Sequence, residues 1–212
     1  MISRQWFNSK NFNPANYIVS NVLMYLRAMY KHNSHLGFDI WEEEAQVQTT
    51  NLSNLVIADK QTWDTTHRGH LPSIILQRQL VTFGGGIQDG GPSRVVQAGA
   101  MIETSVMEIV TVPMVLSCIA RQDLEAEALA FLTGQFLWDD KRWMKAFEMF
   151  GMTSPQISEV QIYNPSENGF VCHVSTSLSM AKKYTMHTLP NNVLQELVVT
   201  VNNHQATLNI ES

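Results

Sequence analysis

The sequence contains few cysteines and no long apolar run. Cys118 and Cys172 are its two cysteines, and both lie in segments that alternate like strands, where a free cysteine behaves as a small apolar residue. We therefore expect a reducing compartment rather than a disulfide framework. No apolar run is long enough for a transmembrane helix, and the N-terminal residues lack the apolar core of a signal peptide. These absences predict a protein that is neither secreted nor embedded in a membrane.

Positive charge is also scarce. The 212 residues include 14 lysines and arginines against 19 aspartates and glutamates, which gives a formal net charge of −5. Electrostatic binding of nucleic acid requires a basic face that replaces condensed counterions, so we do not expect the protein to wrap DNA or RNA. The hydrophobic fraction of 44% allows a sizeable core, and no linker-like segment divides the chain. One domain over residues 1–212 is therefore expected.

The pattern of apolar residues predicts an α+β fold, with a mixed, mainly antiparallel sheet and helices packed on one face. Asn13 and Pro14 suit the N-cap and first position of a helix over about residues 14–32. Periodicity is weak over residues 36–70, where a short apolar piece, Leu55–Ala58, is embedded, and this segment has the character of an insertion or arm. The expected remainder is a core of sheet and helices over residues 71–180 and a C-terminal extension over residues 189–212.

Several segments have the β-branched and apolar content of strands. The longest, Val95–Ala120, has one apolar face and a second that is partly apolar, which is typical of a central strand covered on both sides. Pro113 cannot donate to a ladder, so a bulge or an edge register is expected there. The other expected strands are Ser73–Phe83, Gln156–Tyr163 and Phe170–Met180, followed by a terminal hairpin of Leu197–Val201 and Ala206–Ile210.

Two helices are expected between these strands. Asp123 is a plausible N-cap for the helix DLEAEALAFLTGQFLW, in which Gly134 is a weak point. A second helix would begin at Asp139 or Asp140 and end at a Gly151 C-cap. The residues expected on the buried stripe of the first helix are Leu124, Ala128, Phe131 and Leu132.

Glycine is concentrated in one place: the stretch Gly84–Pro92, GGGIQDGGP, holds five of the eleven glycines. Gly85 and Gly90 have the spacing of a P-loop, but Gly91 and Pro92 follow where phosphate binding needs a lysine and a hydroxyl side chain. No helix pattern begins at this loop, so we expect no nucleotide and no other cofactor. The loop is instead expected to order against another subunit or partner, through Gly84, Gly85, Gly86, Ile87, Gln88, Asp89, Gly90 and Gly91.

Histidines provide the main alternative. His32 with His35, and His67 with His70, form two HxxH pairs with Glu42, Glu43 and Glu44 between them, a set that could hold zinc in a metal-binding protein or hydrolase. Surface or helix-end histidines explain both pairs more simply. The acid pairs Glu125/Glu127 and Asp139/Asp140 are explained as first-turn charges and caps, and no G-x-S-x-G motif is present. We therefore expect no enzyme.

Aromatic residues are frequent between Phe131 and Phe150, at helical spacing beside leucine and alanine. Such a run could stack nucleic-acid bases, but it is more often core or subunit interface, and Trp138 and Trp143 are our candidates for subunit contacts. Three features together favour an assembled ring or tube: the Gly-rich loop, a strand face rich in serine and threonine, and apolar helices with few flanking charges. An adaptor that binds a partner without forming a ring is a further alternative.

Four stretches carry a family resemblance: PSIILQRQLVTFGGG, TVPMVLSCIARQDLEAEALAFLTGQFLW, ISEVQIY and NGFVCHVSTSLSM. Over roughly Leu71–Met180, their succession resembles the tail-terminator and neck (head–tail connector) proteins of tailed bacteriophages. In that family, a strand runs directly into an amphipathic helix of the LEAEALA kind, and an antiparallel pair closes the sheet.

The resemblance implies a non-enzymatic structural protein of the virion, assembled in the host cytoplasm. Copies of the chain would form a ring, typically a hexamer, that contacts the tail tube, the connector or portal-side neck proteins. Genomic DNA would pass through the lumen without being bound, which suits a chain of net negative charge.

Overall fold

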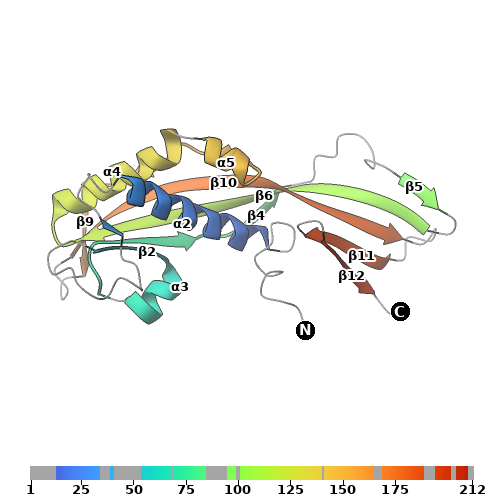
Figure 1. Cartoon of the computed structure of the whole chain (residues 1–212), viewed down its shortest axis with the longest axis horizontal. Coiled ribbons are helices and arrows are strands. Elements are labelled where there is room, and N and C mark those ends of the chain that lie inside the picture. The colour runs from blue at the N-terminus through green and yellow to red at the C-terminus, as the bar shows by residue number, and fades with distance from the viewer. Residues whose placement is uncertain are drawn as a thin grey trace.

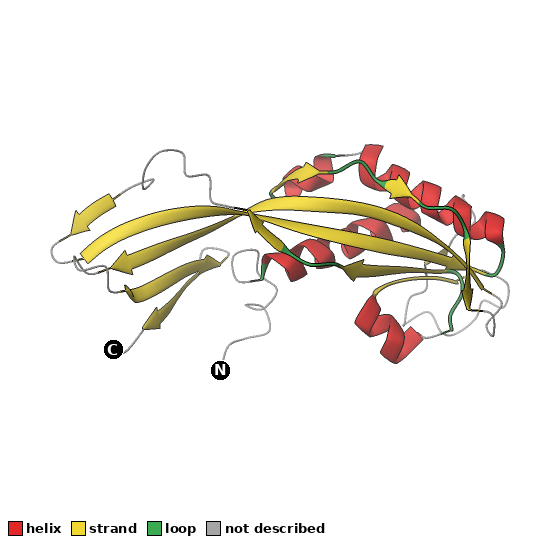
Figure 2. Ribbon diagram, turned by 180° about the vertical axis from the view of Figure 1, so that it is seen from behind, coloured by secondary structure: helices red, strands yellow, loops and turns green. Residues whose placement is uncertain are grey.

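The computed structural model describes residues 13–33, 39–40, 54–67, 69–84, 95–98, 101–139, 141–164, 169–188, 194–201 and 204–209. The molecule is elongated, and two long strands, β6 (Met101–Ala120) and β10 (Gly169–Thr188), run along most of its length (Figures 1 and 2). Helices gather over one half of the sheet that these strands organise. The predicted α+β fold with a mixed, mostly antiparallel sheet is confirmed.

β6 and β10 pair antiparallel without a register shift, from Phe170 opposite Ala120 to Thr188 opposite Ile102. The main path through the sheet is β1-β2-β3-β6-β10-β11-β12, in which β1–β2 and β2–β3 are parallel. These strands are β1 (Asp39–Ile40), β2 (Asn54–Asp59), β3 (Ser73–Arg78), β11 (Leu194–Val201) and β12 (His204–Asn209). Short strands also pair with β6, namely β4 (Thr82–Gly84) and β5 (Val95–Ala98), and with β10, namely β7 (Met149–Met152), β8 (Gln156–Ile157) and β9 (Gln161–Asn164).

The N-terminal helix α2 (Pro14–His32) is confirmed together with its cap. The Asn13 side chain accepts a hydrogen bond from the backbone N–H of Asn16 at 3.1 Å, and proline occupies the first helical turn. Ile18, Val22 and Leu26 are fully buried, because their spacing places them on one side of the helix. This side packs on the face of the sheet formed by the even-numbered residues of β6 and β10.

That face of the sheet is the main core. Its residues are at most 1% exposed, namely Val110, Val112, Met114, Leu116 and Cys118 of β6 with Cys172, Val174, Leu178 and Met180 of β10. The alternation predicted for both strands is therefore confirmed. The opposite face is closed mainly at one end, where Trp63 and Ile119 belong to a second, smaller cluster. The expectation that β6 is covered on both sides thus holds only at that end.

Away from that cluster, the opposite face is half-buried and polar. Thr111 and Ser179 hydrogen-bond across the strands at 2.9 Å, and Ser117 and His173 do so at 3.1 Å. These residues are direct neighbours in the β6–β10 register. The predicted serine- and threonine-rich strand face is therefore present, and these hydroxyls have hydrogen-bond partners on the neighbouring strand.

The irregularity expected at Pro113 is also present. Arg78 lies opposite Met114 and Thr82 lies opposite Thr111, so three residues intervene on one strand and two on the other. The backbone N–H of Gln79 donates to the Pro113 carbonyl at 2.8 Å, so proline's missing donor faces this interruption rather than β10. The single strand predicted over Ser73–Phe83 is consequently divided into β3 and β4.

The buried stripe predicted for the central helix is wrong. Helix α4 (Asp123–Asp139) exists as expected, but Leu124 and Phe131 are 72% and 57% exposed, Ala128 is exposed and Leu132 is half-buried. The residues that face the sheet are Ala126, Leu129, Ala130, Thr133, Gly134 and Leu137. Both sets have helical spacing and apolar members, so periodicity alone could not choose between them.

Two other predicted elements have different bounds in the structure, the long strand and the second helix. The predicted strand Val95–Ala120 is a hairpin in which Ala98 of β5 pairs with Met101 of β6. The second helix, α5 (Arg142–Ala146), begins after Lys141 and ends well before Gly151, which lies in β7. Glu148, with φ of 57°, lies between them, and this left-handed conformation ends the helical path.

Longer-range pairing accounts for the remaining differences. Leu55–Ala58, assigned above to an insertion or arm, lies in β2, is at most 3% exposed and pairs with β3 inside the sheet. The predicted strand Gln156–Tyr163 is divided into β8 and β9, whereas β10 continues past Met180 to Thr188. The predicted terminal hairpin is confirmed, with Val201 of β11 opposite His204 of β12.

Candidate functional site

Helix α4 presents a second apolar side to the outside of the molecule. We call Leu124, Ala128, Phe131 and Trp138 the outer stripe; all four are exposed, and Trp138 is 38% exposed. They recur at intervals of three, four and seven residues and therefore share one side of the helix. A helix that is apolar on both sides is typical of one buried on both sides, so the outer stripe is a candidate contact surface.

Two tyrosines of α2 hold α4 in this orientation. The Tyr25 hydroxyl donates to the Phe136 carbonyl at 2.7 Å, and the Tyr30 and Thr133 hydroxyls hydrogen-bond at 2.9 Å. Burial raises the pKa of Tyr30 well above its ordinary value, so its hydroxyl stays protonated. Because these contacts anchor the inner side of α4, the outer stripe is fixed toward the outside.

The charged residues of α4 itself are all acidic. Glu127 and Asp139 are exposed beside it, and α4 contains no lysine or arginine. Just beyond the helix, the Lys141 ammonium lies 3.4 Å from the centroid of the Trp138 ring, a cation–π contact. The outer stripe is thus apolar, with acidic residues beside it and one lysine at its C-terminal end.

A second candidate surface lies at the other end of the molecule. We call β5, β11 and β12, with residues 101–107 of β6 and 183–188 of β10, the distal sheet. None of the described helices lies over it (Figures 1 and 2). Because β6 and β10 continue without a register shift, one of its faces continues the face that the helices cover elsewhere. We call this the distal face.

The distal face is mostly apolar by register. One row across it, from β5 to β12, consists of Val95, Thr104, Met186, Leu197 and Leu208. Alternation adds the apolar residues Ile102, Val106, Tyr184, Val199, Val201 and Ala206 to the same face, and also the polar residues Gln97, Thr188 and His204. A sheet face of this composition ordinarily packs against another layer. Within the described residues, the chain does not supply that layer.

The candidate subunit contacts from the sequence have different positions. Gly84 ends β4 and is exposed, whereas Gly85, Gly86, Ile87, Gln88, Asp89, Gly90 and Gly91 lie outside the described residues. Trp138 belongs to the outer stripe. Trp143 does not reach the surface: it is 6% exposed and stacks on Tyr25 with ring centroids 4.6 Å apart, so it is a core residue of the single chain.

The described candidate metal ligands lie in separate elements. His32 lies in the last turn of α2, His67 ends the π-helical segment Trp63–His67, and His70 is exposed. His35 and Glu42, Glu43 and Glu44 lie outside the described residues. In the described part of the chain, no three histidine, cysteine or acidic side chains are grouped to hold a metal ion.

The cysteines lie directly opposite each other in the β6–β10 register. Burial raises the pKa of Cys118 to about 12, and burial also raises the pKa of Cys172. The Cys118 thiol donates to the Thr133 hydroxyl at 3.8 Å and the Cys172 thiol to the Ser158 carbonyl at 3.1 Å. These are the properties of structural thiols, because the reactive form of cysteine is the thiolate.

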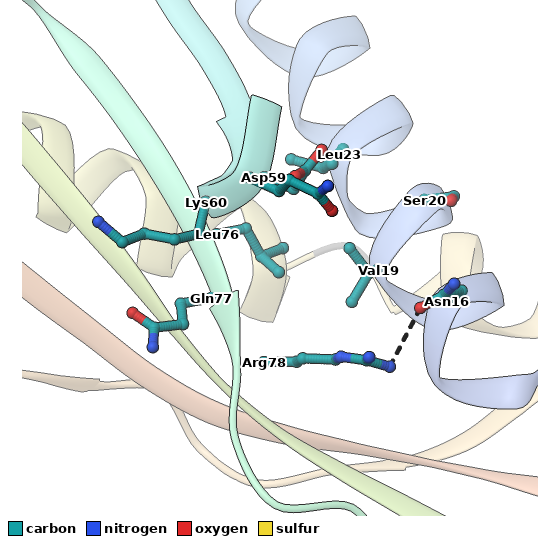
Figure 3. Close-up of a pocket in the computed structure, with 10 residues that line it drawn as sticks. Asn16, Val19, Ser20, Leu23, Asp59, Lys60, Leu76, Gln77 and Arg78 are labelled. Carbon is teal, nitrogen blue, oxygen red and sulfur yellow. Dashed lines mark hydrogen bonds between the residues drawn. The ribbon is translucent and has the colours of Figure 1, made fainter. Parts of the chain in front are cut away.

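A pocket of about 370 Å³ lies between the first half of α2, the end of β3 and the start of α3 (Lys60–Thr62) (Figure 3). Arg78 donates to the Asn16 side-chain oxygen at 3.1 Å across it. The Asp59 carboxylate accepts from the Thr62 backbone and hydroxyl at 2.9 and 2.7 Å. Its described lining contains no histidine or cysteine.

Sequence reasoning missed both the outer stripe and the distal face. The sequence of α4 could have indicated the outer stripe, because its apolar residues occupy two sides of the helix and few positions are polar. The distal face required the β6–β10 register, which no local pattern reports. Comparison of the chain with protein-family models gives no match, and comparison with curated proteins also gives none. None of the described helices is both long and apolar enough to cross a membrane.

Proposed function

We propose that this protein is a structural subunit of a tailed-bacteriophage virion that assembles with copies of itself into a ring at the head–tail junction, as a tail terminator or neck protein. The observation that carries the proposal is a pair of apolar surfaces: the exposed outer stripe of α4, and the distal face, which is mostly apolar by register and has no described helix over it. Surfaces of this kind mark sites of protein–protein contact.

The position of the two surfaces favours a ring. They lie on different parts of an elongated molecule, so a contact between them joins one end of a subunit to another region of the next (Figure 1). Such head-to-tail contacts close into rings when the rotation between subunits allows it. A symmetric dimer would instead bury the same surface twice and leave the other open.

The placement in a phage virion draws on the family resemblance. It supplies the expected neighbours, namely the tail tube, the connector or portal-side neck proteins, and a lumen through which DNA passes. The formal charge of −5 supports a passage that does not retain the DNA phosphates. Buried thiols and a pocket whose Arg78 and Asp59 are already engaged also support a structural role over a catalytic one.

The test is the mass and shape of the purified full chain. Light scattering after size exclusion should give an integral multiple of 24.0 kDa, and negative-stain images should show a ring with a central channel. A monomer at all concentrations would contradict the proposal and favour an adaptor. Stoichiometric zinc or manganese by elemental analysis would favour the metal-binding alternative. In virions of a phage that encodes the chain, antibody labelling should mark the head–tail junction.

A further inference from the structure

We infer that the outer stripe of α4 in one subunit docks on the distal face of the next copy of the chain, so that α4 is buried between two sheets. This inference rests on the ring assembly proposed above and names the two surfaces that meet. The structure contains a helix with a second, exposed apolar side and a sheet face over which no described helix lies. The helix could therefore cover the sheet face, and the sheet face could bury the apolar side of the helix.

The covered half of the same sheet shows that this kind of contact suits the surfaces. There, Leu129 and Leu137 of α4 are fully buried over the even-numbered residues of β6 and β10. The distal face is formed by the same two strands in the same register, with no bulge to reverse its sides. A second helix would therefore meet the continuation of a face that already accepts one.

The dimensions of the two surfaces match. With 17 residues, α4 is about 25 Å long. Residues 101–107 of β6 extend for about 20 Å, and the order β5-β6-β10-β11-β12 spans about 19 Å across the strands. One helix aligned with the strands thus covers the length of the distal face and leaves space at its sides.

The charges are also compatible. The outer stripe is bordered by Glu127 and Asp139. Glu108 lies just outside the distal sheet, on the side of β6 that continues into the distal face. The acidic residues within the distal sheet are Glu103 and Glu196. Both lie opposite His187 and therefore on the other face of the sheet. By register, none of the acidic residues of the distal sheet belongs to the distal face, whereas His204 does. An acid-bordered helix can therefore approach this face without like-charge repulsion.

The first experiment compares two exposed apolar residues in the full chain. Phe131→Glu places a charge in the outer stripe, and Ile162→Glu places the same charge at a position in β9 that is 68% exposed. We expect Phe131→Glu to weaken self-association at least about tenfold and Ile162→Glu to leave it unchanged. At a concentration where the chain is monomeric, both variants should unfold at the same temperature as the starting protein, because assembly itself raises the unfolding temperature. Unchanged association of Phe131→Glu would overturn the inference.

The second experiment uses disulfide trapping to identify which surface contacts the outer stripe. Two chains are mixed, and each carries one added cysteine. A Phe131→Cys chain mixed with a Leu197→Cys chain should give a linked heterodimer under mild oxidation, because the native Cys118 and Cys172 are buried. The matched control is Val198→Cys, which lies one residue away on the other face of the sheet and should give no link with Phe131→Cys.

The outcomes separate this inference from the proposed function. A link that forms through position 197 and not 198 supports the docking. Links between two Phe131→Cys chains, or equal links at 197 and 198, would overturn it. A ring of wild-type mass that gives no link at 197 overturns the docking and leaves the ring proposal standing. A wild-type chain that is always monomeric overturns both.

Discussion

The two halves of the sheet share their central strands and differ in what covers them. Between residues 110 and 118, the even-numbered side of β6 is almost completely buried under α2 and α4. Between residues 101 and 107, the same side of the same strand has no described helix over it (Figure 2). A regular pair of strands thus extends past the layer that completes the core. The described helices cover one half of this face, and none of them lies over the other half.

The largest expected effect compares two tryptophans of the covered half, of which Trp143 is buried and Trp138 is exposed. Trp143→Ala removes a buried ring stacked on Tyr25, so the free energy of unfolding should fall by about 3–5 kcal/mol. Trp138→Ala removes an exposed ring and its contact with Lys141, with a loss of about 0.5–1 kcal/mol. Urea denaturation at a concentration where the chain is monomeric measures both. Similar losses would show that the two rings do not differ in this way.

The next effect sharpens the distinction between the two sides of α4. Leu129→Ala creates a cavity on the inner side and should cost about 2–5 kcal/mol of unfolding free energy. Phe131→Ala should change it by about 0.5 kcal/mol or less in the monomer, because that ring is 57% exposed. Self-association should show the reverse order. If Leu129→Ala were the milder change in the monomer, the orientation of α4 described above would be incorrect.

A smaller effect tests the contacts that fix this orientation. Tyr30→Phe removes the hydroxyl bonded to Thr133 and leaves that buried group with one partner fewer, for a loss of about 1–2 kcal/mol. Hydrogen exchange should become faster in α4 and stay unchanged in β11 and β12, which the tyrosine does not contact. Equal acceleration in all three elements would mean that the two halves unfold as one unit.

The smallest effect depends on pH and is confined to the covered half. Burial opposes ionisation of Asp59, but hydrogen bonds from Thr62 and Gln61 outweigh it, and the pKa of this carboxyl lies below its ordinary value. Its contribution is therefore present above about pH 4 and is lost as pH falls through the lower, folded-state pKa.

The Asp59→Asn variant keeps a capping side chain and removes the titration. Its stability relative to wild type should rise as pH falls from 5 toward 2, with a total change of about 1 kcal/mol or less for this largely exposed group. Urea midpoints measured across this range provide the comparison. A pH-independent difference between the two proteins would contradict the contribution assigned to the carboxylate.

Local features of the sequence were sufficient for much of the fold. The cap at Asn13, the spacing of Ile18, Val22 and Leu26, and the alternation of Phe170–Met180 all predict elements that are present. The effect of Pro113 was also predictable, since a missing donor must face an interruption in one ladder. These signals succeed because each depends on residues within one or two turns of one another.

Other features depended on partners distant in the sequence. Leu55–Ala58 has too few residues to distinguish an inner strand from a loop, and its place is decided by parallel pairing with β3. The buried side of α4 was assigned incorrectly because Leu124 and Phe131 are as apolar as Leu129 and Leu137. Choosing between them required the hydrogen bonds from Tyr25 and Tyr30, more than 90 residues away along the chain.

The amino-acid sequence alone determined the class of fold, the start of α2, the existence of α4 and the period of the strands, because caps, periodicity and proline act locally. Only the tertiary structure decided which side of α4 faces inward, and that β6 and β10 continue together beyond the helices. Both depend on register and packing between distant segments, which the hydrophobic pattern of one segment does not contain. The surfaces available for assembly follow from those two decisions.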